Sequence, residues 1–255
     1  RKKLRVIVNF KSNEANDHGI AWERVSTDRE DVITEAILQL MQGSEADGGR
    51  RRDVHVGLDD YVGAYKTLSS AAGHQWMCHV LVFDTDDMVW RTGELHTLAF
   101  GCVASVMAWW RCATAQKTIL RKPFALEAFF YVDDVHLVEP AESAADAQQI
   151  FRRVVALLGW RLDAAKVQGM SSSAVSLGCA VRVGSRSVKW QLTEEKRKKL
   201  SSEIAAALES GRLIGEEAGR FVGRWMFASQ RVFGRVGRAA IRPLFWRQRH
   251  PANTK

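Results

Sequence analysis

Residues 129–138 have the sequence Phe129-Phe130-Tyr131-Val132-Asp133-Asp134-Val135-His136-Leu137-Val138, in which two adjacent carboxylates interrupt an apolar run. The flanking apolar residues predict two short β-strands, and Asp133 and Asp134 lie where a tight hairpin turn would join them. Asp forms turns well, but two like charges side by side repel, and Asn-Gly or Asp-Gly is the more usual choice for a plain hairpin. A divalent cation would remove that repulsion, so the segment indicates a metal-binding turn.

A second acidic strand end lies upstream. Val54, Val56 and Leu58 alternate with other residues and lead to Asp59 and Asp60, a period typical of a β-strand. Enzymes of phosphoryl transfer use two metal ions roughly 4 Å apart, and carboxylates from separate strands can bridge both. Two acidic strand ends therefore predict polymerase-type chemistry with two Mg²⁺ ions, for which Mn²⁺ could substitute.

Several blocks of the chain resemble a reverse transcriptase, in the order in which that family has them. Asp60 followed by Tyr65 resembles the first catalytic motif, and Phe100-Gly101 resembles part of the second. The third motif is matched by residues 131–134, with Asp133 lying 73 positions after Asp60. The remaining matches are the fingers strand at residues 5–11, the fourth motif at 157–166 and the primer-grip turn at 177–181. Blocks in this order together indicate the family more strongly than any one motif.

The resemblance implies a role for each matched residue. Asp60, Asp133 and Asp134 would be catalytic metal ligands, joined by the backbone carbonyl of Tyr61, and Lys166 would protonate the leaving pyrophosphate. The incoming nucleotide would contact Arg5 through its triphosphate, Tyr65 as the steric gate against a 2′-hydroxyl, and Phe100 and Gly101.

The implied fold is α+β, the right-hand polymerase fold, with an antiparallel palm sheet backed by helices, with fingers and with a helical thumb. Its implied subdomains are fingers at 1–52 and 70–97, palm at 53–69 and 98–188, a basic helical thumb at 189–249 and a tail at 250–255. Helical patterns and caps predict helices from Thr27 to Gly43, from Ser105, from Ser143 through Leu158, from Thr193 to Gly211, from Glu216, and within 233–246.

Positive charge is concentrated near the C-terminus. Residues 182–255 contain 17 Lys and Arg against 6 Asp and Glu, a net charge of +11, whereas the rest of the chain has 20 against 23, or −3. This asymmetry predicts a segment that grips phosphates and whose binding weakens with salt. The expected contacts are Lys196, Lys199, Arg231, Arg235 and Arg238, although a solvated helix face would explain the run at 196–199 equally well. Trp225 and Trp246 are expected in the core.

The expected function is template-directed DNA synthesis on RNA or DNA, with a primed template and deoxynucleoside triphosphates as partners. The motif spacing resembles retrotransposon enzymes of the long-terminal-repeat or tyrosine-recombinase kind, which implies an intracellular enzyme. No apolar run is long enough to span a bilayer, and the four cysteines show no Cys-x-x-Cys pair. The chain begins without Met, so we expect an excerpt whose ribonuclease H or integrase region, if any, lies elsewhere; the oligomeric state stays open.

Three alternatives remain. Asn9 and Ala99 stand where the family usually has Asp and Pro, which also fits a degenerate, inactive copy that only binds nucleic acid. An RNA-dependent RNA polymerase shares the palm but usually has Gly before the Asp pair and a polar residue in place of Tyr65. Asp84-Thr85-Asp86-Asp87 could hold a metal-bound sugar nucleotide, as in glycosyltransferases, although a turn explains it more simply.

Overall fold

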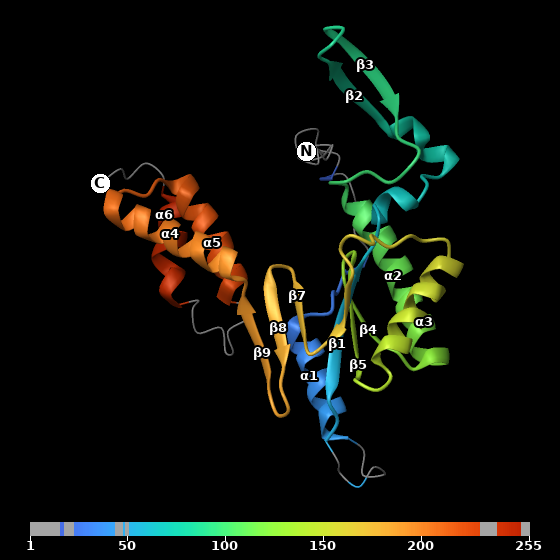
Figure 1. The fold of residues 1–255 in the computed structure, drawn as a ribbon. Coiled ribbons are helices and arrows are strands. Elements are labelled where there is room, and N and C mark those ends of the chain that lie inside the picture. Colours follow the sequence, from blue (N-terminus) through green and yellow to red (C-terminus); the bar gives the residue numbers. More distant parts are fainter. Residues whose placement is uncertain (1–15, 18–22, 44–47, 49–50, 230–238, 251–255) are drawn as a thin grey trace. The chain divides into compact units, whose positions relative to one another are not determined.

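The computed structural model describes residues 16–17, 23–43, 48, 51–229 and 239–250 (Figure 1). The chain divides into two compact units, Arg1–Ser171 and Ser172–Lys255. Arg5, Arg231, Arg235 and Arg238 lie outside the described residues, and the subdomain limits expected from the sequence stay predictions.

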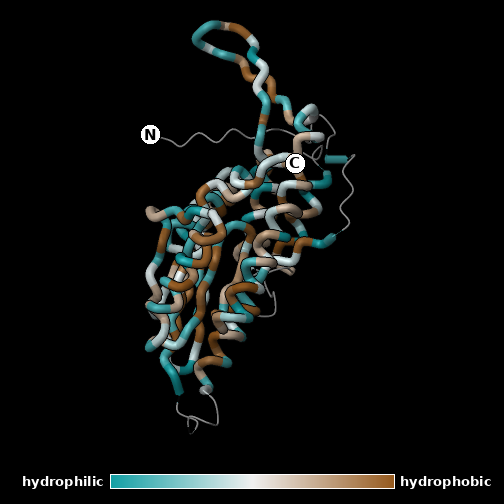
Figure 2. The backbone as a smooth tube through the Cα atoms, turned by 90° about the vertical axis from the view of Figure 1, so that its right-hand side faces the viewer, coloured by the Kyte–Doolittle hydropathy of each residue, from teal (hydrophilic) through white to brown (hydrophobic). Residues whose placement is uncertain are grey.

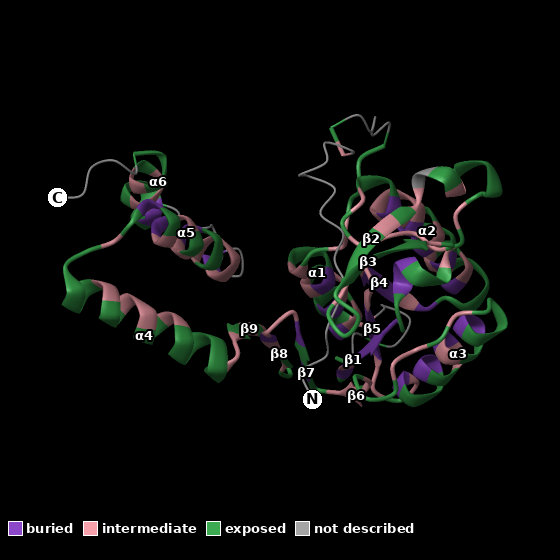
Figure 3. Ribbon diagram, turned by 90° about the horizontal axis from the view of Figure 1, so that it is seen from above, coloured by how far each residue is buried: buried purple, intermediate pink, exposed green. Residues whose placement is uncertain are grey.

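The elements of the N-terminal unit are α1 (Glu30–Gln42), β1 (Val54–Asp60), β2 (His79–Asp84), β3 (Val89–Glu94), α2 (Val103–Phe124), β4 (Glu127–Tyr131), β5 (Asp134–Pro140), α3 (Ala144–Leu157) and β6 (Gln168–Ser171), with short 3₁₀ helices at Ala64–Thr67 and Ala72–Met77. Four of its strands form an antiparallel sheet in the order β4-β5-β1-β6, and β2 pairs with β3 in a separate hairpin. Helix α1 lies on one face of the sheet, and α2 and α3 lie on the other (Figures 1 and 3). This mixture of helices and antiparallel sheet confirms the predicted α+β class.

The strands that end in the acidic residues are part of the hydrophobic core. Strand β1 lies inside the sheet and is buried along nearly its whole length, and Phe129 and Phe130 of β4 are also buried. Hydrophobic residues run along these strands in Figure 2. Burial of apolar side chains on both faces fixes the register of the strands, because a slip of one residue would turn every side chain to the other face.

Two helices of the N-terminal unit begin elsewhere than predicted. Helix α1 starts at Glu30 rather than in a Thr27 capping box, because Asp28 is bound to β4 instead. Its amide donates to the carbonyl of Phe130 (3.0 Å), and its carboxylate accepts hydrogen bonds from the amide of Phe130 (2.9 Å) and from Lys117 Nζ (2.6 Å). Helix α2 starts at Val103 rather than Ser105, since the side-chain oxygen of Asn16 accepts a hydrogen bond from the amide of Val103 at 3.0 Å. Side chains distant in sequence therefore decide both helix starts.

Helix α3 begins after Ser143 as predicted. Its apolar stripe would carry Ile150, Val154, Leu157 and Leu158 onto the sheet; Val154 is in the core, and Ile150 packs against it. Leu157 and Leu158 do not pack on the sheet, because the helix ends at Leu157 and both residues are exposed, Leu157 by 87%.

The C-terminal unit contains β7 (Ser173–Ser176), β8 (Cys179–Val183) and β9 (Val188–Leu192), which form an antiparallel sheet, followed by α4 (Glu194–Ser210), α5 (Gly215–Ser229) and α6 (Arg242–Arg249). Thr193 and Gly211 flank α4, as predicted. Helix α4 buries none of its residues (Figure 3), whereas α5 and α6 pack on each other. None of the helices within the described ranges is both long and apolar enough to cross a membrane.

Candidate active site

The two acidic strand ends meet at one edge of the central sheet. Asp60 is the last residue of β1, Asp134 is the first residue of β5, and the antiparallel register places them directly opposite each other. Directly opposed residues of an antiparallel pair point to the same face, with Cβ atoms about 4.5–5.5 Å apart. The structure therefore brings together two carboxylates that lie 74 positions apart in the sequence.

Asp133 lies in the two-residue turn formed by Val132 and Asp133, which joins β4 to β5. Val132 has φ +58°, in the left-handed region that favours glycine and that a β-branched residue rarely adopts. The indole Nε1 of Trp109 on α2 donates a hydrogen bond to the carbonyl oxygen of Val132 at 2.7 Å. A buried side chain thus contacts the backbone of the turn directly.

Negative charge accumulates around Asp134. Burial, together with the charges of Asp133 and Asp60, raises the pKa of Asp134 to about 6, and the charge of Lys166 opposes that rise. The three carboxylates are therefore close enough to repel one another. Such mutual repulsion of carboxylates is the electrostatic condition that a bound divalent cation relieves.

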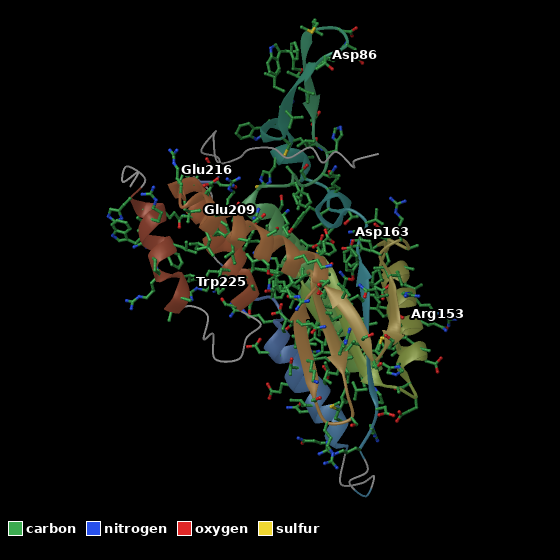
Figure 4. The ribbon with its side chains drawn as sticks, turned by 60° about the vertical axis from the view of Figure 1, so that its left-hand side comes forward. Asp86, Arg153, Asp163, Glu209, Glu216 and Trp225 are labelled. Atoms are coloured by element: carbon green, nitrogen blue, oxygen red, sulfur yellow. The ribbon has the colours of Figure 1, made fainter. Side chains whose placement is uncertain are left out.

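Lys166 contacts this group directly. Its Nζ donates a hydrogen bond to Oδ2 of Asp60, and this bond and the charges of Asp163 and Asp133 raise the pKa of Lys166. The segment that carries Lys166 is bound along the end of β1. Its backbone bonds run from the amide of Asp163, labelled in Figure 4, to the carbonyl of Asp60 (2.8 Å), and from the amide of Val62 to the carbonyl of Arg161 (2.9 Å).

The donor set fits a hard divalent cation, because Mg²⁺ prefers carboxylate oxygens. Across residues 16–17, 23–43, 48, 51–229 and 239–250, however, no three His, Cys, Asp or Glu side chains are arranged as a metal-binding cluster. Lys166 holds one oxygen of Asp60. Two backbone hydrogen bonds flank the Tyr61–Leu162 bridge, and they use the carbonyl of Asp60 and the amide of Val62. The carbonyl of Tyr61, a predicted metal ligand, takes part in neither of them. Metal binding through Oδ2 of Asp60 would therefore require Lys166 to move.

Asp59 has a different role from its neighbour Asp60. Adjacent residues of a strand point to opposite faces, and Asp59 points toward α3. There Gln148 Nε2 lies 2.8 Å and Arg152 Nε 3.0 Å from its carboxylate oxygens. Burial raises the pKa of Asp59, opposed by these two partners. The sequence alone assigned no function to Asp59. The signal that could have identified its partners was the i, i+4 spacing of Gln148 and Arg152 on the predicted helix.

Tyr65 and Phe100 form a second part of the site. Tyr65 lies in the buried 3₁₀ turn after β1, and its ring packs edge-on against Phe100 with centroids 5.0 Å apart. Burial and the charge of Asp133 raise the pKa of Tyr65, so the ring is near the acidic group. Gly101 has φ +97°, and its carbonyl accepts a hydrogen bond from Asn16 Nδ2 at 2.9 Å. Asn16 was not predicted.

An aromatic cluster lies beneath the acidic group. The ring of Tyr61 packs edge-on against Trp109 at 5.0 Å, and Trp109 packs edge-on against Trp160 at 6.0 Å. The hydroxyl of Tyr61 donates to Gln116 Oε1 at 2.6 Å, and burial raises its pKa.

The predicted phosphate contacts on α4 differ from each other. Lys196 donates to the carbonyl of Leu177 at 2.8 Å and lies 4.5 Å from the ring centroid of Phe227. A Cβ on Gly178 would overlap the Lys196 side chain, so this glycine lets the lysine lie over the β7–β8 turn. Lys199 is exposed on the same helix.

Helix α6 presents an exposed basic and aromatic stripe. Its members are Arg242, Trp246, Arg249 and His250. The spacing of four, seven and eight residues places them on one face of a helix. The prediction that Trp246 is a core residue is wrong: Trp246 is 53% exposed, and its ring stacks on His250 with centroids 4.7 Å apart.

The other acidic cluster is part of a turn. Asp84 accepts hydrogen bonds from the amide of Asp86 (3.0 Å) and from Arg91 Nε (2.7 Å) at the tip of the β2–β3 hairpin, where Figure 4 labels Asp86. The Arg91 bond and the amide bonds lower the pKa of Asp84. The sequence Asp84–Asp87 thus stabilises a hairpin.

Comparison with known proteins identifies the fold. No protein-family model matches the chain, and no curated protein matches it. One similar solved structure is a foamy viral protease-reverse transcriptase in complex with an RNA/DNA hybrid, with a TM-score of 0.58 and 15% identity, covering 88% of this chain and 26% of that one. Another is a foamy viral protease-reverse transcriptase dRH in complex with double-stranded DNA, with a TM-score of 0.60 and 15% identity, covering 95% and 36%. The chain thus spans well under half the length of either structure and has a reverse-transcriptase-like fold.

Proposed function

We propose that this chain adds deoxynucleotides to the 3′-hydroxyl of a primer, directed by an RNA or DNA template. The observation that carries the proposal is the register that sets Asp60 opposite Asp134, with Asp133 in the adjoining turn and Lys166 bound to Asp60. The similarity to reverse transcriptase structures supports it.

Asp60, Asp133 and Asp134 would hold two Mg²⁺ ions, or Mn²⁺ in their place, with the carbonyl of Tyr61 as a further oxygen ligand. When bound, the ions would lower the pKa of the attacking hydroxyl and neutralise the triphosphate. The raised pKa of Asp134 is consistent with this assignment, because burial comes first among its causes and the negative charges of Asp133 and Asp60, which Lys166 opposes, add to it.

The remaining residues would orient substrate and move a proton. Lys166, once released from Asp60, would donate its proton to the leaving pyrophosphate. Tyr65, backed by Phe100, would pack beneath the incoming sugar and exclude a 2′-hydroxyl, beside the backbone of Gly101. Arg5, which lies outside the described residues, remains the predicted contact for the triphosphate.

The C-terminal unit would bind the phosphates of the primed template. Its net positive charge and the α6 stripe support this role, as do the nucleic acids in the similar structures. We name the sheet that bears the Asp residues the palm, the segment around the β2–β3 hairpin the fingers and the C-terminal helices the thumb. The retroelement class and the intracellular location stay predictions from the sequence resemblance.

A second candidate is a degenerate copy that binds nucleic acid without extending a primer. One observation favours it: the described residues contain no preformed three-ligand metal cluster. The three Asp and Lys166 are nevertheless retained, which favours the enzyme.

Primer extension on an RNA template with deoxynucleotides and Mg²⁺ separates the two candidates. Asp133→Asn should abolish extension, whereas Asp146→Asn, the same change on an exposed residue of α3, should leave it intact. A folded wild-type chain that shifts a primer–template duplex at low salt but does not extend the primer would favour the degenerate binding protein.

A further inference from the structure

We propose, on the basis of the function above, that Trp109 is a positioning residue: its indole N–H holds the Val132–Asp133 turn in the shape that lets Asp133 and Asp134 bind metal. Nothing in the sequence distinguishes Trp109 from an ordinary core aromatic. The proposal rests on three observations of the structure.

The first observation is the strain in the turn. Val132 adopts φ +58°, where its branched side chain meets its own backbone. Glycine at this position would adopt this conformation without such strain. Because the chain has Val at this position, other interactions must hold the turn in place, and Val132 also packs partly against the core.

The second observation is the bond itself. Trp109 is 1% exposed, and its Nε1 lies 2.7 Å from the carbonyl oxygen of Val132. A buried N–H that loses its acceptor pays the full cost of desolvation. The turn therefore cannot change its peptide orientation at Val132 without leaving the indole unpaired.

The third observation is the placement of the Trp109 ring. It contacts Tyr61, which follows Asp60, and Trp160, which precedes the segment that carries Lys166. One side chain of α2 thus contacts the three segments that supply Asp60, Asp133 and Lys166. A rigid donor in this position orients metal ligands in the way that outer-shell partners do in metal sites generally.

The test is a double-mutant cycle between Trp109 and Val132. Trp109→Phe removes the N–H and keeps an aromatic ring, while Val132→Gly allows the left-handed turn without help. Mn²⁺ binding to the free protein is measured by the electron paramagnetic resonance signal of unbound Mn²⁺, beside the Mg²⁺ concentration for half-maximal extension, the primer–template Kd and the melting temperature. Trp110→Phe, the same change at the next residue of α2, partly buried against the same core, is the matched control.

We expect Trp109→Phe to weaken Mn²⁺ binding by about 10- to 100-fold, the usual effect of losing an outer-shell partner, with unchanged primer–template affinity. In the Val132→Gly background the same substitution should change Mn²⁺ affinity by less than about 3-fold, because the two positions are coupled. Trp110→Phe should lower the melting temperature and leave the metal dependence unchanged.

Equal losses in both backgrounds would overturn the proposal, since they would mean that the cavity, and not the turn, is responsible. A folded Trp109→Phe protein with wild-type Mn²⁺ affinity would also overturn it. A wild-type chain that binds Mn²⁺ but does not extend a primer would count against the polymerase alone, and the cycle would still decide the role of Trp109. A wild-type chain that binds no Mn²⁺ would overturn both.

Discussion

Lys166 donates a hydrogen bond to the carboxylate of Asp60 across 106 positions of sequence. The predicted proton donor and the predicted metal ligand are thus bound to each other, and each must release the other before either acts. This pairing has a consequence that a conventional catalytic lysine would not show.

Lys166→Met should slow nucleotide addition by about 100-fold or more, the usual contribution of a general acid. It should also tighten Mn²⁺ binding, because the ammonium no longer competes for Asp60. Rapid-quench incorporation of a single nucleotide and Mn²⁺ titration measure the two effects. Lys122→Met, at an exposed position of α2, is the control. Weaker Mn²⁺ binding by Lys166→Met would show that Lys166 helps to assemble the metal site instead of competing with it.

The pKa of Asp134, raised to about 6, predicts how stability depends on pH. The folded protein binds more protons at this carboxyl between about pH 4 and 6 than the unfolded chain does, so the free energy of unfolding contributed by Asp134 falls as pH rises through this range. Asp134→Asn should therefore stabilise the fold at pH 7.5, by of order 1–3 kcal/mol. That gain should disappear near pH 4. Urea unfolding of both proteins at the two pH values measures the difference, and an equal gain at both would rule out the titration of Asp134 as its cause.

Asp59→Asn and Asp60→Asn should have opposite effects. Asp59 is buried with Arg152 and Gln148, so Asp59→Asn should lower the free energy of unfolding by about 2–4 kcal/mol, as expected when one partner of a buried ion pair is removed. Asp60→Asn should abolish extension with little loss of stability, because Lys166 is about half exposed. Thermal unfolding and primer extension of the two proteins check this; equal stability losses would contradict the division of roles between them.

Tyr65→Ala should admit ribonucleotides, because the ring proposed to block the 2′-hydroxyl is removed. Selectivity for deoxynucleotides should fall by at least about 10-fold, the lower limit for loss of a pocket contact. Tyr65→Phe keeps the ring against Phe100 and should keep the selectivity. Single-nucleotide incorporation with paired deoxy- and ribonucleotides measures both; unchanged selectivity in Tyr65→Ala would place the gate elsewhere.

The α6 stripe should bind the nucleic-acid backbone and a base or sugar face. Arg242→Ala and Arg249→Ala should each reduce the slope of log K against log salt by about 1. Trp246→Ala should weaken binding by about 1–3 kcal/mol without changing that slope. Fluorescence anisotropy of a labelled primer–template at several salt concentrations measures these changes. If the exposed Lys122→Ala, placed in the N-terminal unit, had the same effect as the arginine variants, the binding would be diffuse.

The strands that carry the Asp residues could be predicted from the sequence, because the pattern of apolar residues that defines them is local. The alternation in β1 and the short apolar runs around Asp133 predict three strands, and a two-residue turn leaves β4 and β5 no partner arrangement other than a hairpin. The resemblance implied that Asp60, Asp133 and Asp134 share one site, but not the register that sets Asp60 opposite Asp134.

Contacts between distant segments were not predictable. Asn16 decides where α2 begins, and Asp28 is bound to β4 just before α1. The bond from Trp109 to Val132 depends on a rotamer and a strained peptide, which no periodicity reports. The hydrophobic character of Trp246 predicted burial, whereas Trp246 is exposed on α6 and stacks on His250.

Alternate residues of β1 point to opposite faces of the sheet, so the position of a residue along this strand decides whether its side chain reaches the site. Asp59 and Asp60 are chemically the same residue, yet one binds Arg152 on the α3 face and the other stands opposite Asp134. A copy of this chain with one residue inserted within β1 could keep both aspartates, the Tyr-Val-Asp-Asp segment and Lys166 while exchanging the faces of Asp59 and Asp60. A sequence survey would count such a copy as intact, although it would have lost the proposed catalytic centre.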